Sequence, residues 1–246
     1  MSADATKSPH TKDVRRTSRR PTTVSIVIPT LNEEDCILDT LAAAAATHPH
    51  ELIVVDGGSV DRTRGAATAA GYLVIEASRG RAVQMNTGAA AATGDILLFL
   101  HADTRLPPNA LGDVTRSFAD ARIVGGRFDV TLDGPEPIFR LIETLMNVRS
   151  RVTRIATGDQ AIFVRRSAFE ALGGFAPIPL MEDIHFSFRL KRHGRVACLR
   201  SRVRTSARRW RRHGVWRTMV LMWWLRALYA AGVSPDWLAR RYAAIR

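Results

Sequence analysis

Four short apolar runs, separated by segments that suit helices, constrain the fold of this chain more than any other feature of its sequence. The runs are residues 24–28, 52–55, 72–75 and 96–100, and the last of them is the most apolar. Uninterrupted apolar strands, as opposed to alternating ones, are typical of a sheet that is covered on both faces. The alternation of strands and helices therefore predicts an α/β fold with a mainly parallel sheet and helices on both faces.

The segments between these runs and the second half of the chain add helices and two further strands. We expect three parts: a disordered basic leader over residues 1–21, a globular α/β domain over 22–199, and a basic helical extension over 200–246 that packs on the domain or lies at a membrane surface. Pro29 is expected to stop the first strand. Helices are predicted over residues 32–47, from 59 or 61 to 70, and over 81–93, 107–121, 138–151, 167–172, 182–193, 215–231 and 236–245, with strands over 124–132 and 161–164.

Charge is concentrated at the two ends of the chain. The net charge is +13, and residues 200–246 carry twelve arginines and one aspartate, whereas the middle is close to neutral. Basic ends suit an anionic lipid surface or a nucleic acid, although an arginine-rich solvated tail has the same composition. Because no RNA- or DNA-binding motif is visible, we expect no nucleic-acid partner. An anionic membrane surface remains open as a partner.

The expected location follows from what the sequence lacks. The first twenty residues hold no apolar stretch, and no run of about 18 uncharged apolar residues occurs, so neither a secretory signal nor a membrane span is expected. The two cysteines, Cys36 and Cys198, are too few for a disulfide framework and are expected to be free thiols. The expectation is a cytoplasmic protein, or one that is peripheral on the inner face of the plasma membrane.

Polar residues directly follow three of the four apolar strands. Asn32 and Glu33 follow the first strand, Asp56 the second and Asp103 the fourth. Ligands of open parallel sheets bind beyond the carboxyl ends of the strands, so we expect these side chains at one ligand site. Asp56, which precedes two glycines, can accept a hydrogen bond from the N–H edge of a base, or it can simply close a strand–turn–helix connection.

Two further acidic positions are candidates for metal and proton chemistry. Asp103 offers carboxylate oxygen to a hard divalent cation that bridges two phosphates, and His101 is either an added nitrogen ligand or an ordinary satisfied histidine. Glu182 and Asp183 begin a predicted helix, where acids complement the helix dipole. One of the two can instead act as the general base that takes the proton of an attacking sugar hydroxyl.

A series of short motifs runs along the chain in a fixed order. They are Pro29-x-x-Asn32-Glu33, Asp56-Gly57-Gly58-Ser59-Val60-Asp61-Arg62-Thr63, Gly80-Arg81, Asn86-Thr87-Gly88, Gly94-Asp95, the Asp-x-Asp position at 101–103, Gly158-Asp159, Gly173-Gly174-Phe175 and Glu182-Asp183. Each motif is weak alone, but their order and spacing together are specific. Over roughly residues 23–245 the chain resembles the inverting glycosyltransferases of family 2, and more narrowly a bacterial branch of transferases associated with radical-SAM and selenium domains.

The resemblance implies a GT-A-type catalytic domain over residues 22–199 and a hexosyltransferase-like activity. One sugar would move from a nucleoside-diphosphate sugar, with UDP favoured, to a hydroxyl of a small molecule, a lipid or a glycan. The cofactor would be Mg²⁺ or Mn²⁺ on Asp103, with His101 as a second candidate ligand, while Asp183 would be the base and Glu182 would touch the acceptor. The nucleotide would be bound by Pro29, Thr30, Asn32, Glu33, Asp56, Gly58, Arg81, Gln84 and Ala102, and the diphosphate and acceptor by Gly158, Asp159, Arg209 and Trp210.

Three positions depart from the pattern of the family. Gly57 stands where many members have a second Asp, and His101 stands where the first Asp of Asp-x-Asp is usual, so metal binding would depend more on the diphosphate oxygens. Processive members carry Gln-x-x-Arg-Trp, whereas this chain has Ser206-Ala207-Arg208-Arg209-Trp210. The missing Gln favours transfer of a single sugar. A surface arginine and a packed tryptophan remain the alternative interpretation of Arg209 and Trp210.

Two other functions fit parts of the sequence. A nucleotidyltransferase that acts on sugar phosphates usually opens with a Gly-rich loop, and here Pro29-Thr30-Leu31-Asn32 follows the first strand instead. A non-catalytic, basic membrane-binding protein would use Trp223, Trp224 and Arg226 in an interfacial helix, although a helix packed on the domain has the same pattern. Binding of nucleoside diphosphates would discriminate, because a ligand of the folded state raises the melting temperature.

Overall fold

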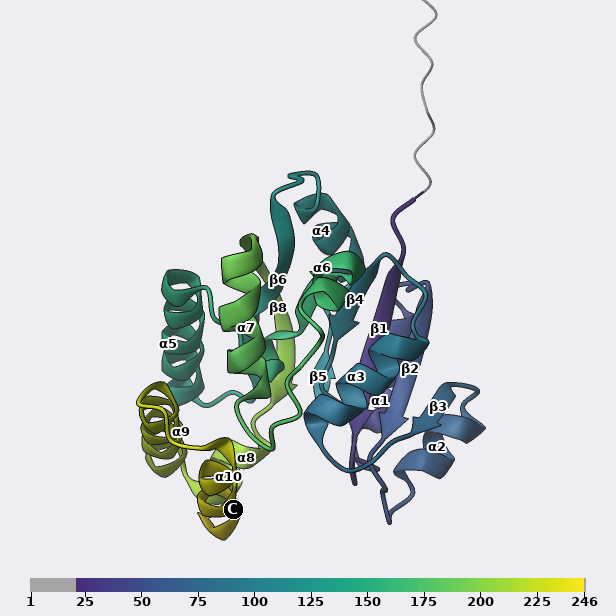
Figure 1. The fold of residues 1–246 in the computed structure, drawn as a ribbon. Coiled ribbons are helices and arrows are strands. Elements are labelled where there is room, and N and C mark those ends of the chain that lie inside the picture. The colour runs from purple at the N-terminus through teal and green to yellow at the C-terminus, as the bar shows by residue number, and fades with distance from the viewer. Residues whose placement is uncertain (1–20, 246) are drawn as a thin grey trace, which may run out of the picture.

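The structure of the protein, a computed structural model, describes residues 21–245, with side chains as far as Tyr242. Apart from Pro21, the predicted basic leader lies outside the described residues. Within them, the strands form one sheet with helices on both faces (Figure 1), which confirms the predicted fold class. The strands are β1 (Val24–Thr30), β2 (Glu51–Asp56), β3 (Leu73–Glu76), β4 (Ile96–Phe99), β5 (Thr104–Arg105), β6 (Ile123–Asp133), β7 (Ile162–Arg165) and β8 (Arg195–Ser206). The helices are α1 (Ile37–Ala45), α2 (Thr63–Ala69), α3 (Arg81–Ala91), α4 (Ala110–Ser117), α5 (Pro137–Thr153), α6 (Arg166–Ala171), α7 (Glu182–His193), α8 (Arg208–His213), α9 (Val215–Ala230) and α10 (Pro235–Ile245), with a short 3₁₀ helix η1 (Gly158–Gln160).

The first half of the sheet is parallel, as its apolar strands predicted. β1 pairs with β2 on one side and with β4 on the other, and β3 joins the far side of β2. Val27 and Ile53 pack on one face and Ile28 and Val54 on the other, and none of the four has exposed surface. Both faces of these strands are buried, which explains why the strands lack the alternation of a half-exposed sheet. β1 includes Pro29 and ends one residue later, so the proline does not stop the strand.

The second half of the sheet is mixed. The strand order is β3-β2-β1-β4-β7-β6-β8-β5, with β7 antiparallel to β4 and β6, and β8 parallel to β6 but antiparallel to β5. Sequence analysis predicted no element over β8. Exposed arginines at positions 200, 202 and 204 alternate there with the buried Val203 and Thr205, and the strand carries little apolar surface. The domain boundary predicted between residues 199 and 200 falls inside this strand, so the sheet itself runs on to Ser206.

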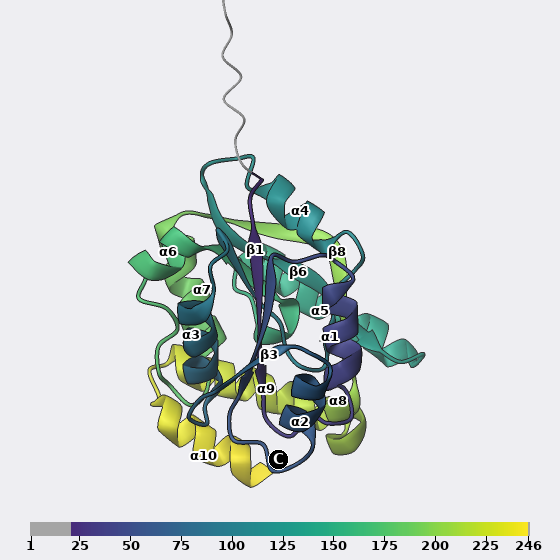
Figure 2. The same cartoon turned by 90° about the vertical axis from the view of Figure 1, so that its right-hand side faces the viewer.

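The helices cover the two faces of the sheet in two groups. α1, α2 and α4 pack on one face, and α3, α6 and α7 pack on the other (Figure 2). On the second face, Phe99, Phe169, Phe175 and Phe186 form an aromatic cluster with ring centroids 4.5 to 5.7 Å apart. Such pairs contribute beyond their buried area, so they fix α7, which begins at Glu182, firmly against β4.

The C-terminal helices α8, α9 and α10 lie at the end of the sheet where β1, β2 and β4 finish (Figures 1 and 2). Leu225 of α9 and Leu238 of α10 are fully buried in a cluster with Ile155, Met181 and Ile184. Part of the basic extension thus packs on the domain, directly against the beginning of α7. None of the helices between residues 21 and 245 combines the length and apolar character that a membrane crossing needs.

Candidate active site

The loops that follow β1 and β2 are tied together by hydroxyl side chains of the second motif. The Asn32 N–H donates to Ser59 Oγ at 2.9 Å, and the Glu33 N–H donates to Thr63 Oγ1 at 2.7 Å. Asn32 has a φ of 54°, a left-handed conformation that Asn tolerates better than most residues. Ser59 and Thr63 therefore shape the first loop, and the helix predicted from residue 32 begins only at Ile37 because the preceding residues form this turn.

Asp56 ends β2 with a buried carboxylate that is only partly used by the protein. Oδ2 accepts the N–H groups of Gly58 at 3.0 Å and Ser59 at 2.9 Å. Oδ1 is buried and has no hydrogen-bond partner in the described part of the chain. Leaving a buried carboxylate oxygen unpaired is costly, so the position suits a donor supplied by a ligand. Asp56 forms the turn with one oxygen and keeps the other for such a donor.

Gln84 supports this turn from α3. Its Nε2 donates to the carbonyl oxygens of Thr30 at 2.7 Å and Val55 at 2.9 Å, and the residue is 4% exposed. A Cβ atom on Gly57 would lie 2.9 Å from the Gln84 amide, which is closer than real contacts allow. A side chain at position 57, where many family members have a second Asp, would require the Gln84 amide to move. Gln84 holds the ends of β1 and β2, and its contact with a ribose or diphosphate stays a prediction.

Asp103 lies after β4, between Glu33 and two arginines. Nη2 of Arg208 is 3.9 Å from Asp103 Oδ2 and donates to Glu33 Oε2 at 2.7 Å. Burial and then the charge of Glu33 raise the pKa of Asp103 above its ordinary 3.8, and Arg208 and Arg209 oppose this rise. A partly desolvated carboxylate beside another acid favours an added cation. Arg208 joins the loops after β1 and β4. It is absent from the predicted site because its partners are remote along the chain.

His101 is a histidine packed against Gly158. A Cβ on Gly158 would lie 2.3 Å from His101 Nε2, so only glycine leaves room for the ring. Nε2 is buried, and no described residue hydrogen-bonds to it. Burial, followed by the charges of Arg81 and Arg209, holds the pKa of His101 well below 6.5, so the ring is neutral near pH 7. A neutral ring can accept a hydrogen bond or ligate a cation, and the role of metal ligand stays a prediction.

Asp183 reaches the same region from the first turn of α7. Its Oδ2 accepts the N–H of Gly158 at 2.7 Å, and its Oδ1 accepts the N–H of Ile184 at 2.7 Å. Gly158 also contacts His101, so one residue separates Asp183 from the loop that carries Asp103. The carboxylate is half-buried, which leaves it able to complement the helix terminus and to meet a ligand.

Glu182 connects this region to α3. Glu182 is buried and pairs with Nη1 of Arg81 at 3.1 Å. Burial is the main cause that raises the pKa of Glu182 above 4.5, while Arg81 opposes it. The Arg81 side chain is still 43% exposed, so it can also meet an anion from solvent. Since Gln84 lies one turn further along α3, this helix links the Asp56 side of the site to the Asp183 side.

Of the remaining predicted residues, Ala102 and Gly58 act through their backbone, and Asp159 and Arg209 through their side chains. The carbonyl of Ala102 accepts Thr40 Oγ1 at 2.6 Å, and Gly58 adopts a φ of 88° that suits glycine. Asp159 Oδ1 is buried and has no partner among the described residues. Arg209 lies over the ring of Tyr242, 5.9 Å from its centroid.

Trp210 packs in a different environment from its neighbour. It contacts a buried cluster that contains Leu132, Phe139 and Ile142, as the packed-tryptophan alternative predicts. The structure thus gathers Asp56, Asp103, Asp183 and their neighbours by contacts at one edge of the sheet, whereas the partly buried Trp210 packs against the cluster beside α5. A contact between Trp210 and the acceptor stays a prediction.

The donor set fits a divalent cation only in part. No three His, Cys, Asp or Glu side chains among the described residues come together as a metal cage. Asp103 and Asp159 act on each other electrostatically, and the unpaired Oδ1 of Asp159 adds carboxylate oxygen, which hard cations prefer. These residues fit an ion that takes its other ligands from a diphosphate and from water.

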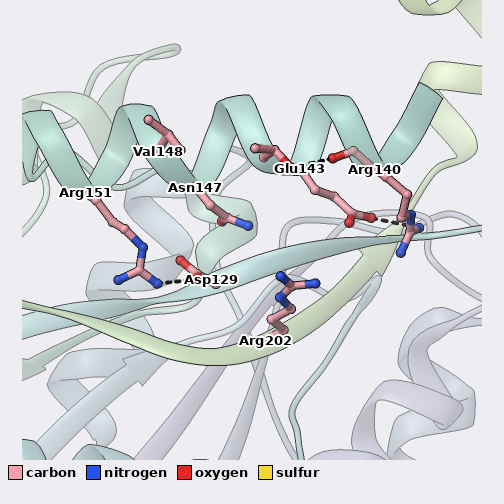
Figure 3. Close-up of a pocket in the computed structure, with 8 residues that line it drawn as sticks. Asp129, Arg140, Glu143, Asn147, Val148, Arg151 and Arg202 are labelled. Atoms are coloured by element: carbon pink, nitrogen blue, oxygen red, sulfur yellow. Dashed lines mark hydrogen bonds and ion pairs between the residues drawn. The ribbon is translucent and has the colours of Figure 1, made fainter. Parts of the chain in front are cut away.

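The cavity drawn in Figure 3 lies elsewhere, between α5 and the strands β6 and β8. It has a volume of about 390 Å³, and its acids are already paired. Asp129 pairs with Arg151, and Glu143 pairs with Arg140 at 2.8 Å. No residue of the predicted site lines this cavity. Its polar groups therefore serve the packing of α5 on the sheet.

Comparisons with known proteins agree with this architecture. The model of a family described as Glycosyl transferase family 2 matches residues 25–173, more than half of the chain. A glucosyl-3-phosphoglycerate synthase of Mycolicibacterium smegmatis is 36% identical over 93 residues, but the match covers only 33% of this chain and 31% of that protein.

Among solved structures, the chain is similar to Staphylococcus aureus TarS 1-349 and to a mannosyltransferase of Pyrobaculum calidifontis in complex with GDP-Man and Mn²⁺. TarS 1-349 has a TM-score of 0.58 and 19% identity over 76% of this chain and 61% of that one. The mannosyltransferase has a TM-score of 0.57 and 24% identity over 76% and 57%. At these identities the likeness shows the fold alone.

Proposed function

Because the chain belongs to glycosyl transferase family 2, we propose that it is an inverting glycosyltransferase that moves one sugar from a nucleoside-diphosphate sugar to an acceptor hydroxyl. UDP is the favoured donor nucleotide, and the bacterial branch associated with radical-SAM and selenium domains is the favoured group within the family. Residues 22–199, extended by the rest of β8, would form the catalytic domain, and the helices after it would cover the site.

The observation that carries the proposal is the contact between Asp183 and Gly158. Asp183 Oδ2 accepts the Gly158 N–H at 2.7 Å, and Gly158 packs directly on His101, two residues before Asp103. A carboxylate on the acceptor half of the chain thus stands beside the loop expected to hold the donor diphosphate. A general base and a leaving group must be neighbours of this kind in a single displacement.

In the proposed reaction, Asp183 accepts the proton of the acceptor hydroxyl while that oxygen attacks the anomeric carbon. The bond from that carbon to the diphosphate oxygen breaks, and the nucleoside diphosphate leaves with the electron pair. Arg81 and Arg209 stabilise the negative charge that develops on the diphosphate. Asp56 Oδ1 accepts an N–H of the base, and Glu182, which pairs with Arg81, touches the acceptor.

A divalent cation would be held by Asp103, with Asp159 as the nearest further carboxylate and His101 as a candidate nitrogen ligand. When bound, Mg²⁺ or Mn²⁺ supplies Lewis-acid stabilisation of the departing diphosphate. Two proteins of similar fold support the use of a divalent cation. The P. calidifontis mannosyltransferase is described with GDP-Man and Mn²⁺, and a Mycobacterium tuberculosis glucosyl-3-phosphoglycerate synthase with Mn²⁺, UDP and phosphoglyceric acid.

Thermal unfolding with nucleotides tests the proposal. We expect UDP to raise the melting temperature more than ADP or GDP, and Mn²⁺ or Mg²⁺ to enlarge the shift, since a ligand that binds only the folded state stabilises it. A ligand at about 100 times its Kd stabilises by about 2.7 kcal/mol. If no nucleoside diphosphate shifts the transition, with or without the metal, the assignment as a nucleotide-sugar enzyme is wrong.

We also propose that α5 and α9 dock on an anionic membrane. The two helices meet through buried clusters: Val215 at the start of α9 packs against the cluster of Phe139 and Ile142 of α5, and Leu221 against the cluster of Ile155, just after α5. Each helix exposes an apolar stripe opposite its packed face, with exposed fractions between 41% and 79%. The stripes are Leu141, Leu145, Val148 and Val152 on α5, and Trp216, Val220, Trp223 and Trp224 on α9. Arginines around apolar and aromatic residues suit an interface of this kind.

Vesicle sedimentation tests the membrane surface. The protein is expected to bind vesicles of phosphatidylglycerol and to bind phosphatidylcholine vesicles much less, with weaker binding as salt rises. Val152→Ser should weaken binding, whereas Val60→Ser, the same change at a still more exposed valine on the loop after β2, should leave it unaltered. Equal binding to neutral and anionic vesicles, or equal effects of the two substitutions, would contradict the assignment of this face.

A further inference from the structure

Two arginines beside the candidate base make no ion pair with any residue in the described part of the chain. Nε and Nη2 of Arg149 are buried and hydrogen-bond to no described residue. The side chain of Arg226 likewise makes no hydrogen bond or ion pair with the described residues. Burial and then the charge of Arg226 lower the pKa of Arg149 to about 10, so the Arg149 guanidinium is still charged at neutral pH. Two neighbouring cations, one of them enclosed without an acceptor, cost stability unless an anion joins them.

The packing of four elements places these arginines next to Asp183. Gln160 of η1 donates from Nε2 to Ser150 Oγ at 3.0 Å, so the α5 residue that follows Arg149 touches the segment that carries Asp159. Leu225 of α9 packs with Ile184 of α7, which brings Arg226 to the beginning of α7. Asp159 and Asp183 both act electrostatically on Arg149.

Tyr229 confirms the direction in which α9 faces. It lies three residues after Arg226, on the same side of the helix. Burial and then the charge of Asp183 raise the pKa of the Tyr229 hydroxyl, so this side of α9 looks toward the candidate base. Two arginines, Arg149 and Arg226, therefore lie near the hydroxyl of Tyr229 and the carboxylate of Asp183.

The donor diphosphate is not the natural partner of these arginines. Its expected ligands, Arg81 and Arg209, are the cations that act on His101, whereas Arg149 and Arg226 do not. Arg149 lies on α5, whereas Arg81 lies on α3 and Arg209 on α8. An anion held there would sit on the acceptor side of Asp183, where the attacking hydroxyl must also be.

We propose that Arg149 and Arg226 form an anion subsite for the acceptor, so that the acceptor carries a phosphate or a carboxylate close to the hydroxyl that is glycosylated. This inference rests on the proposed function, which it deepens by naming a class of acceptor. A guanidinium presents parallel N–H donors that match either group, and binding the anion would orient the hydroxyl toward Asp183. Asp159 and Asp183 keep the subsite from being purely cationic and leave room for a polar acceptor.

The test uses sulfate as a tetrahedral probe in place of phosphate, which precipitates with Mn²⁺. Acetate is the carboxylate probe. Each is titrated at constant ionic strength against chloride, with the full-length protein, in the presence and absence of saturating UDP and Mg²⁺. UDP blocks the diphosphate site, so a remaining shift in melting temperature reports the second site. The variants are Arg149→Gln, Arg149→Lys, and the control Arg192→Gln, which removes an exposed charge from the far end of α7.

We expect at least one of the two anions to stabilise the UDP-bound wild type and the Arg192→Gln variant. The probe that does so identifies the group carried by the acceptor. Arg149→Gln should weaken its binding by about 10- to 100-fold, and Arg149→Lys should weaken it less, since it keeps the charge without the planar fork. UDP should bind Arg149→Gln as tightly as it binds the wild type.

The free Arg149→Gln protein distinguishes this role from a structural one. Because no described residue hydrogen-bonds to or pairs with the guanidinium, its loss should leave the melting temperature without ligand unchanged or higher. A lower melting temperature with unaltered anion binding would mean that Arg149 is structural. No stabilisation by either anion in the wild type, or equal stabilisation in Arg149→Gln, would also overturn the subsite. If the wild type does not bind UDP, the proposed function is contradicted instead. The anion titration without UDP would still show whether the subsite exists.

Discussion

Three residues of the candidate site have a buried polar atom without a hydrogen-bond partner in the described part of the chain. Asp56 Oδ1, His101 Nε2 and Asp159 Oδ1 are each enclosed without a partner among the described residues. Most buried polar groups in folded proteins are paired, and an exception needs a cause. All three atoms belong to positions that the motifs had already singled out, so the sequence could predict where to look. It could not predict that the atoms are unpaired, because burial depends on residues far along the chain.

Asp56→Asn tests the unpaired carboxylate oxygen. The amide oxygen can keep the bonds to the N–H groups of Gly58 and Ser59, but the NH₂ group then presents a donor where the base presents a donor as well. We expect UDP affinity to fall by about 10- to 100-fold with little change in melting temperature, as measured by calorimetric titration. Asp39→Asn, an exposed position on α1, is the matched control. Unchanged affinity in Asp56→Asn would remove Asp56 from the nucleotide site.

His101 should make the stability of the metal-free protein depend on pH. Its pKa is depressed below 6.5 in the folded state, so the unfolded chain binds the proton at a higher pH. The free energy of unfolding contributed by this group is therefore complete above pH 6.5 and is lost as the pH falls below it, by at most about 1.4 kcal/mol per pH unit. Denaturant unfolding between pH 7.5 and 5.5 should give a shallower pH dependence for His101→Gln. Parallel curves would mean that His101 is not buried as a neutral ring.

Among the helices and strands, the sequence predicted best those whose pattern is local. The four apolar strands and α7 lie close to the predicted ranges. β1, β2 and β4 are buried on both faces, whereas β3, at the edge of the sheet, is only partly buried. β8 was missed, since its arginines alternate with residues that are buried only after β6 and β5 pair with it. The same reason hid Arg208, Arg226 and Tyr229 from the predicted site. Their neighbours in space, Glu33, Arg149 and Asp183 respectively, lie far away in sequence. Only the packing of α8 and α9 brings them together.

Leu225 tests whether α9 is an integral part of the catalytic unit. The residue has no exposed surface and packs on Met181 and Ile184 at the beginning of α7. Leu225→Ala should reduce the free energy of unfolding by about 2–5 kcal/mol, through lost contacts and a cavity. Val220→Ala, on the exposed side of the same helix, should change it by less than about 0.5 kcal/mol. Equal and small effects would mean that α9 does not pack on the domain in solution.

In the molecule as a whole, the two halves of the chain meet at one edge of the sheet, where the candidate site lies. The parallel half supplies Asp56 and the loop of Asp103, and the mixed half supplies Gly158 and Asp183. α3 bridges them, since Gln84 holds the ends of β1 and β2 while Arg81 pairs with Glu182. The central claim is that this arrangement separates donor binding from proton removal, with Asp183 responsible only for the latter.

Comparing Asp183→Asn with the wild type tests this claim most directly. Calorimetric titration would measure UDP binding with Mn²⁺, and nucleoside diphosphate release with an acceptor would measure turnover. Asp236→Asn, which also removes an exposed acid from the first turn of a helix, controls for the helix dipole. We predict that Asp183→Asn binds UDP as the wild type does and loses about 10²- to 10⁴-fold in turnover, the usual contribution of a general base. Turnover that persists in Asp183→Asn, or UDP binding and turnover that fall together, would contradict the account.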